Sequence, residues 1–313
     1  MAKRNYLSVT LKGIGMGTAD VIPGVSGGTI AFITGIYEEL LDSIKSIDLT
    51  AVKLLFTLRL KEFWKKINGN FLISLIAGIA LAAFTLAKLM TWLLENHSIP
   101  VWAFFFGLIA ASTVIVSKRV PKWSSTNILA LALGAAAAYF LTRVTPTTTP
   151  DTWWFIMLSG AIAICAMILP GISGAFILVL LGKYHYILNA VTELNIGILG
   201  VFLIGVVIGI LSFSRALSWL LHHYHNITIA ALTGFMVGSL AKIWPWKTVT
   251  FIYNKEGMTE MEHNVLPGQF EAMTGEDPQL LTVIGLCLIG FVLIWAIETI
   301  ANKKQEKTIT ANE

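Results

Sequence analysis

The sequence predicts an all-α, polytopic membrane protein made of two inverted repeats, each a re-entrant broken-helix hairpin followed by three transmembrane helices. Three observations predict this fold. The 313 residues are 56% hydrophobic and only 13% charged, with a mean hydropathy of +0.75, which is too apolar for a soluble globular protein. The same Pro-Gly-x-Ser-Gly break interrupts apolar sequence twice, and basic residues concentrate in alternate connections.

The broken segment Gly13–Tyr37 returns as Gly160–Tyr184, 147 positions later. Proline lacks the N–H that continues a helix, and glycine is a poor helix former. Within hydrocarbon, such backbone persists only if it is buried in protein or lines a wet cavity. Matching breaks in two repeats are typical of a transporter's binding site, although each could also be a tightly packed kink. The predicted hairpin turns are Pro23, Gly24, Pro170 and Gly171.

A second set of matches, among them Gly78 with Gly205 and Gly107 with Gly234, has an offset of 127. The change of offset places about 20 extra residues in the Lys-rich, partly amphipathic segment 38–69, and gene duplication explains both sets. The first repeat, 1–146, is predicted to hold a hairpin at 13–37 and spans near 71–94, 99–117 and 128–142. The second repeat, 147–313, is predicted to hold a hairpin at 153–182 and spans near 196–221, 228–243 and 280–300.

Basic loops favour the cytoplasmic side of a membrane. If neither hairpin crosses the bilayer, the amino terminus, the Lys-rich segment, residues 118–122 and the Lys-rich tail all lie on that side. Both termini are then cytoplasmic, and three crossings in each half invert one half relative to the other. The competing arrangement, in which each broken helix spans fully, puts the Lys-rich segment opposite the amino terminus.

The second half-helices are expected to begin at Ser26, Gly27, Gly28 and Thr29, and at Ser173 and Gly174. The first N–H groups of a helix lack intrahelical partners, and its N-terminus carries about half a positive charge. Such an end suits an anion, and phosphate in particular. The alternative is that the Ser and Thr side chains cap the half-helices and that nothing binds.

Three further groups of charged or titratable residues bear on function. Lys88 and Arg215 are equivalent in the two repeats and lie within apolar helices, where charges are usually functional; they either receive an anionic headgroup or snorkel to the interface. Asp20 precedes the first break and could carry a coupling proton or sodium ion, or bond freed backbone. No cofactor is expected. No metal site is expected at His222, His223 and His225, because no carboxylate is spaced with them.

The motif Ala19–Thr29, with its partner Leu169–Gly174, resembles the bacterial PopT-type polyprenyl-phosphate transporters, a family formerly known only as a domain of unknown function. The resemblance implies a lipid transporter, not an enzyme, that returns undecaprenyl phosphate from the outer to the inner leaflet of the cytoplasmic membrane for cell-envelope synthesis. Its implied partners are that lipid and membrane lipids; the net charge of +4 gives no reason to expect nucleic acid. The second copy has Met167 in place of Asp20, and Ala175 and Phe176 in place of Gly28 and Thr29, so the hairpins need not act equally.

Two other functions fit parts of the sequence. Ser214, Arg215 and His222 faintly resemble the Ser-Arg…His signature of integral lipid phosphatases. The spacing between the arginine and the histidine is one residue too long for that signature, and the Asp that should follow is missing. Paired half-helix N-termini would also suit a small-anion channel or exchanger. A lipid needs a lateral opening to the bilayer, whereas a small ion does not. The sequence does not decide between these two substrates.

Overall fold

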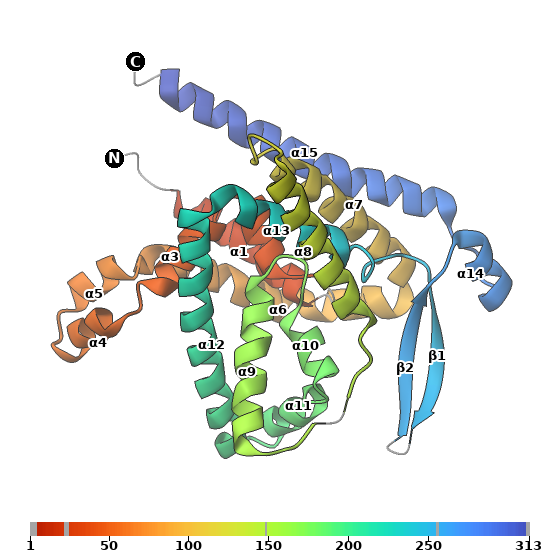
Figure 1. Cartoon of the computed structure of the whole chain (residues 1–313), viewed down its shortest axis with the longest axis horizontal. Helices are drawn as coiled ribbons and strands as arrows, with labels where there is room; N and C mark the ends of the chain where they lie inside the picture. The colour runs from red at the N-terminus through yellow and green to blue at the C-terminus, as the bar shows by residue number, and fades with distance from the viewer. Residues whose placement is uncertain (1–4, 22–24, 148, 255–256, 311–313) are drawn as a thin grey trace. The chain divides into compact units, whose positions relative to one another are not determined.

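The computed structural model describes residues 5–21, 25–147, 149–254 and 257–310 (Figure 1). The described residues form fifteen α-helices and one two-stranded sheet. In the first half the helices are α1 Tyr6–Val21, α2 Gly27–Ile33, α3 Tyr37–Lys45, α4 Leu49–Phe56, α5 Leu60–Lys66, α6 Gly69–Asn96, α7 Ser98–Ser117 and α8 Ser125–Arg143. In the second half they are α9 Trp153–Ile168, α10 Gly174–Leu180, α11 Tyr184–Thr192, α12 Ile196–His223, α13 His225–Ser239, α14 Pro267–Thr274 and α15 Leu280–Thr310.

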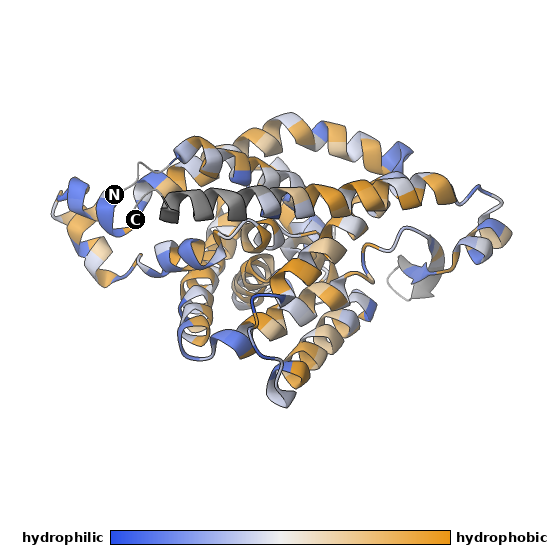
Figure 2. Cartoon of the chain, turned by 90° about the horizontal axis from the view of Figure 1, so that it is seen from above, coloured by the Kyte–Doolittle hydropathy of each residue, from blue (hydrophilic) through white to orange (hydrophobic). Residues whose placement is uncertain are grey.

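Four of the described helices, α6, α7, α8 and α12, are long and apolar enough to cross a membrane. The bent pair α10 and α11, which meet at 110°, would make a fifth. Figure 2 shows hydrophobic colour along most helices and hydrophilic colour mainly in their connections. The chain is therefore a mostly helical, multi-pass membrane protein, as predicted.

Two of the predicted spans end several residues away from the ends of the helices observed. The span expected at 228–243 is α13, which ends at Ser239 because the chain then tightens into turns with i to i+3 hydrogen bonds from Leu240 to Ile243. The span expected at 280–300 belongs to the longer α15, whose apolar part is Leu280–Ala296.

The prediction of an all-α chain is wrong in one segment. Residues 245–279, which lie between two predicted spans, contain strands β1 Lys247–Asn254 and β2 Gly257–Asn264, paired antiparallel with Lys247 opposite Asn264. The run Thr-Val-Thr-Phe-Ile-Tyr at 248–253 explains the strand, because β-branched and aromatic residues fit a pleated surface. Helix α14 follows and is capped at its C-terminal end by Gly275, whose φ of 73° suits glycine.

The helix boundaries repeat as the sequence does. Helices α9, α10 and α11 begin and end 147 residues after α1, α2 and α3, and α12 begins and ends 127 residues after α6. The packing also repeats: Gly13 of α1 contacts the backbone of Leu75 in α6, and Gly160 of α9 contacts that of Phe202 in α12. Equivalent helices therefore pack in equivalent pairs, while the inversion of one half relative to the other stays a prediction.

The chain forms two compact units, which do not follow the predicted repeat boundary. Unit 1 comprises residues 1–91 and 144–228, and unit 2 comprises residues 92–143 and 229–313. Within unit 2, α7 packs on α15 at Gly107 and Cys287, and α13 packs on α8 at Gly234 and Leu131. Each unit thus combines helices from both halves of the sequence.

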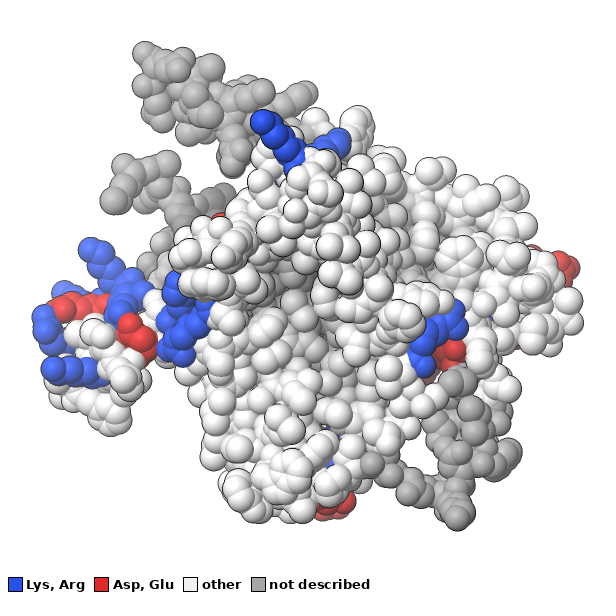
Figure 3. All heavy atoms as spheres, in the orientation of Figure 1, with Lys and Arg blue, Asp and Glu red and all other residues white. Residues whose placement is uncertain are grey.

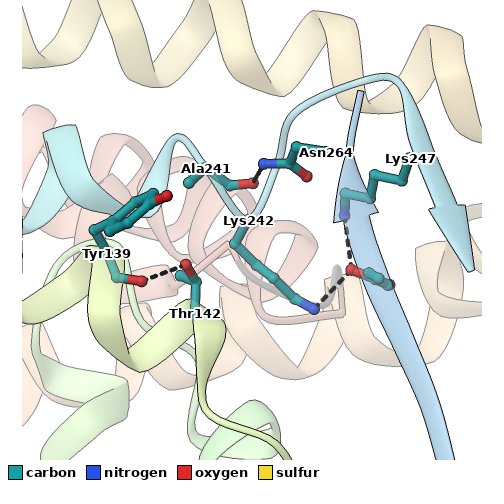
Figure 4. Close-up of polar contacts among 7 residues, drawn as sticks. Tyr139, Thr142, Ala241, Lys242, Lys247 and Asn264 are labelled. Atoms are coloured by element: carbon teal, nitrogen blue, oxygen red, sulfur yellow. Dashed lines mark hydrogen bonds and ion pairs between the residues drawn. The ribbon is translucent and has the colours of Figure 1, made fainter. Parts of the chain in front are cut away.

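The sheet segment of unit 2 is held by one ion-pair cluster and a buried apolar group. Lys242 and Lys247 both point toward one carboxylate (Figure 4), that of Glu262, whose Oε2 lies 2.9 and 3.1 Å from their ammonium nitrogens. Lys247 also lies 4.4 Å from the centre of the Trp102 ring. Beneath them is a buried group made of Ile99, Ala103, Trp246, Phe270 and Val283.

Candidate functional site

The first broken helix folds back on itself as a hairpin. Helix α1 ends at Val21 and α2 begins at Gly27; the predicted turn residues Pro23 and Gly24 lie outside the described residues. Near the tip, the N–H of Gly27 donates to Oδ1 of Asp20 at 2.7 Å. At the other end, Nζ of Lys12 donates to the carbonyl of Thr34 at 2.7 Å.

The second broken helix forms the equivalent hairpin. Helix α9 ends at Ile168, Pro170 and Gly171 lie in the turn, and α10 then packs back on α9. Gly171 has a φ of 93°, a conformation that only glycine adopts readily. At the start of α10, the hydroxyl of Ser173 accepts a hydrogen bond from the N–H of Phe176 at 3.4 Å.

The two hairpins meet within unit 1 through side chains of the first and backbone of the second. The hydroxyl of Ser26 donates to the carbonyl of Met167 at 2.8 Å, and that of Tyr37 donates to the carbonyl of Ile168 at 3.1 Å. The N–H of Gly171 donates to Oγ1 of Thr29 at 2.8 Å. These bonds satisfy backbone groups that the break in α9 leaves without helical partners.

At the start of α2 the first backbone N–H groups already have partners from the chain itself. The Gly28 N–H donates to Oγ of Ser26 at 3.0 Å, and the Thr29 N–H to the Ser26 carbonyl at 2.9 Å. Ser26 and Thr29 are fully buried. In this conformation Asp20, bonded to Gly27, holds the position where an anion was expected, and the Ser26 side chain caps this half-helix, whereas the Thr29 hydroxyl bonds the second hairpin.

The start of α10 is more open than that of α2. Its Ala175 is exposed, whereas Gly28, the equivalent residue of α2, is buried. Within the part of the chain that the structure describes, no hydrogen bond is made by the N–H groups of Gly174 and Ala175. The two half-helix ends therefore differ, as the unequal motifs suggested.

Asp20 is the one charged side chain at the hairpin tips. Its second carboxylate oxygen, Oδ2, is buried and has no hydrogen-bond partner among the described residues. A buried ionised oxygen without a donor is unfavourable, and an ionisable group at membrane depth usually marks a functional site. The same carboxylate lies so close to Gly27 that a side chain there would collide with it.

Lys88 and Arg215 make no polar contact with the described residues of the hairpin tips. Lys88 lies six residues after Ala82, which contacts Gly17 of α1. Arg215 lies six residues after Gly209, which contacts Ile164 of α9. Both side chains are exposed. The Arg215 guanidinium donates to the carbonyls of Leu211 and Ile47, at 3.2 and 3.1 Å, and the Lys88 ammonium has no polar partner in the described chain.

Sequence reasoning missed two contributors. Tyr37 donates a hydrogen bond to the second hairpin. Its presence in the first motif copy and that of Tyr184 in the second could have indicated that this tyrosine has a role. Lys183 is buried at the open end of the second hairpin, where Nζ donates to the Thr149 carbonyl at 2.6 Å and to Asp151 at 2.5 Å. A lysine directly after an apolar half-helix was the signal there.

Ser214 and His222, which belong to the phosphatase-like signature, bond to different backbone carbonyls and not to each other. Ser214 is buried and its hydroxyl donates to the Leu211 carbonyl, while Nδ1 of His222 lies 2.7 Å from the Ser218 carbonyl. Within the described ranges, no three His, Cys, Asp or Glu side chains are grouped closely enough to hold a metal ion.

The chain is similar to known proteins over most of its length. A family described as undecaprenyl phosphate translocase-like matches residues 16–261. A polyprenyl-phosphate transporter of Vibrio cholerae serotype O1 is 47% identical over 302 residues, covering 96% of this chain and 98% of the relative. A polyprenyl-phosphate transporter of Staphylococcus aureus is 35% identical over 253 residues, covering 75% and 85%. No solved structure matches the chain.

Proposed function

Because the chain belongs to the undecaprenyl phosphate translocase-like family, we propose that it transports a polyprenyl phosphate across the bacterial cytoplasmic membrane. The substrate is undecaprenyl phosphate, carried from the outer to the inner leaflet, so that the lipid carrier is reused for cell-envelope synthesis. No covalent bond of the lipid is broken. The observation that carries the proposal is the meeting of two broken-helix hairpins through Ser26, Thr29 and Tyr37.

The phosphate group binds where the two tips meet. The phosphate oxygens accept hydrogen bonds from the N–H groups of Gly27, Gly28 and Gly174 and from the hydroxyls of Ser26, Thr29 and Ser173. Helix ends and closely spaced backbone N–H groups suit phosphate. Because the first-hairpin donors now bond Asp20 and Met167, binding requires an exchange of partners, and the tips separate as the headgroup enters.

Asp20 couples this exchange to an ion. A carboxylate and a phosphate that compete for the same N–H groups repel each other strongly in a poorly screened site. A proton taken up by Asp20, or a sodium ion beside it, removes that repulsion. Its unpartnered Oδ2 leaves one oxygen ready for either.

Lys88 and Arg215 attract the headgroup on its way to and from the tips. The halves are inverted, so the two cations serve opposite faces of the bilayer, and the basic connections keep both termini cytoplasmic. Arg215 releases the Ile47 carbonyl when it takes the phosphate.

Transport is tested in liposomes that contain the purified full-length protein and undecaprenyl phosphate, with leaflet-selective detection of the lipid. We expect rapid equilibration between leaflets, and a pH or sodium gradient should bias it. Ser26→Ala with Thr29→Ala should slow it at least tenfold, whereas the control Ser74→Ala, which removes a hydroxyl bonded only within α6, should not.

Two outcomes of the same assay contradict the proposal. Release of inorganic phosphate from the lipid would favour a phosphatase. Flux of chloride or inorganic phosphate without movement of the lipid would favour a small-anion channel.

A further inference from the structure

The pair of short helices α4 and α5 is an insertion that only one repeat contains. Residues 46–68 join α3 to α6, whereas the equivalent helices α11 and α12 are joined by residues 193–195 alone. The second repeat builds its hairpin and long helix without such an insertion. The first repeat therefore carries α4 and α5 for a purpose other than completing the repeated fold.

The insertion presents large apolar side chains that the rest of the described chain does not cover. All of residues 46–68 are described, and only Ala51 and Ile67 among them are buried. Leu49, Phe56 and Leu58 are 88%, 82% and 80% exposed. On α4, residues 49, 52 and 56 share one face, because they are spaced i, i+3 and i+7.

Leu58 supports a role for these side chains outside the chain. It lies in the turn between α4 and α5 with a φ of 56°, a left-handed conformation normally taken by glycine or asparagine. The turn closes the end of α4, where the Arg59 N–H donates to the Leu54 carbonyl at 3.0 Å, but this bond does not need an exposed leucine side chain. The Leu58 side chain is explained if it contacts something apolar beyond the protein.

Positive charge surrounds this apolar face. The insertion carries Lys53, Arg59, Lys61, Lys65 and Lys66 against Asp48 and Glu62. Glu62 pairs with Arg59 at 2.6 Å and Asp48 with Lys66 at 3.0 Å. The remaining three lysines are exposed and have no partner in the described chain. Figure 3 shows Lys and Arg side chains gathered over α4 and α5 at the left, beside uncharged surface.

Neither helix can cross the bilayer. Helices of eight and seven residues measure roughly 10–12 Å at about 1.5 Å per residue, against about 30 Å of hydrocarbon. Short helices with apolar and Lys-rich faces lie instead in the headgroup layer, where anionic lipids attract them. We propose that α4 and α5 dock this transporter on the anionic phospholipid surface of the membrane, with Leu49, Phe56 and Leu58 inserted and Lys53, Lys61 and Lys65 on lipid phosphates.

The test places a spin label in the turn of the insertion. Full-length protein with Cys165→Ala, Cys287→Ala and Thr57→Cys is labelled and placed in nanodiscs of phosphatidylcholine, with or without phosphatidylglycerol. We expect the label to become accessible to oxygen and shielded from an aqueous nickel complex when phosphatidylglycerol is present. Lys53→Gln, Lys61→Gln and Lys65→Gln together should weaken this docking roughly 100-fold, since each lysine near an anionic surface contributes about fivefold.

A matched control removes three basic residues elsewhere, with Lys118→Gln, Arg119→Gln and Lys122→Gln, and should leave the label shielded. Equal nickel access in both lipid compositions would overturn the proposal. So would unchanged docking of the triple-lysine variant. Concentration-dependent coupling between labels on different molecules would overturn it too, because the face would then bind a second copy.

Discussion

At the scale of single residues, Asp20 combines a structural role with the coupling role that we propose for it. Its Oδ1 caps α2 through Gly27, and this role needs only an oxygen acceptor. Its Oδ2 has no partner in the described chain, and only the proposed coupling role would use it. The two roles respond differently to loss of the charge.

Asp20→Asn separates these roles, because asparagine keeps the acceptor oxygen but cannot take up a proton. We expect thermal stability close to wild type, transport slowed at least tenfold, and loss of the response to a pH gradient. The measurements are thermal unfolding in detergent and the liposome assay. Normal transport with its full pH response would show that Asp20 only caps the helix.

Thr29 carries one of the three hydrogen bonds described between the two hairpins. Thr29→Val removes the acceptor of the Gly171 N–H and leaves a buried donor unsatisfied, which should reduce the free energy of unfolding by about 1–3 kcal/mol. Thr29→Ser keeps the oxygen and is the control, with a smaller loss. Denaturation of the purified protein measures both, and equal stabilities of the Val and Ser variants would disprove the role of this bond.

At the scale of elements, most of the helices could be predicted from the sequence repeat. Proline and glycine end helices for local reasons, so both breaks and the helices around them could be predicted. The bonds from Ser26 and Tyr37 to the second hairpin could not be, because they join residues more than 130 positions apart. The strand at 247–254 could have been predicted from its run of β-branched and aromatic residues, but the hydrophilic residues of the segment around it favoured a loop.

Lys183 fixes the second hairpin to the connection between the repeats. Lys183→Met leaves the Thr149 carbonyl without its donor and should destabilise the protein by about 1–3 kcal/mol. Asp151→Asn should cost less, because Asp151 is largely exposed and exposed ion pairs contribute little. A larger loss in the Asp151 variant than in the Lys183 variant would reverse this assignment.

The sheet segment should loosen in acid. Burial tends to raise the pKa of Glu262, but the charges of Lys247 and Lys242 outweigh it and lower that pKa below 4.5. A carboxyl group with a lowered folded pKa stabilises above its ordinary value, and this stabilisation is lost as the pH falls below 4.5. Hydrogen exchange of β1 and β2 should therefore accelerate there.

Glu262→Gln is the variant that tests this cause. Hydrogen exchange of β1 and β2 in this variant should already be faster than in the wild type at neutral pH. It should also accelerate less on acidification. An equally steep acid response in Glu262→Gln would mean that another carboxyl group is responsible.

At the scale of the whole molecule, equivalent helices pack in equivalent ways although the compact units ignore the repeat boundary. Gly107 of α7 meets α15, and its repeat counterpart Gly234 in α13 meets α8. Each half thus supplies the packing partner of the other. Such an exchange could not be predicted from sequence, because helix periodicity identifies an apolar face but not the helix that covers it.

The arrangement of the halves in the bilayer is the remaining prediction. With three crossings per half and two re-entrant hairpins, single cysteines at Lys61 and Lys303 should react only from the cytoplasm, and one at Glu276 only from outside. A membrane-impermeant maleimide applied to intact cells or to inverted vesicles, in the Cys165→Ala and Cys287→Ala background, measures this. If Lys61 reacted from the outside, the first hairpin would be a full crossing. The tips would then not enter from opposite faces, and an inverted pair could not present one phosphate site to both leaflets in turn.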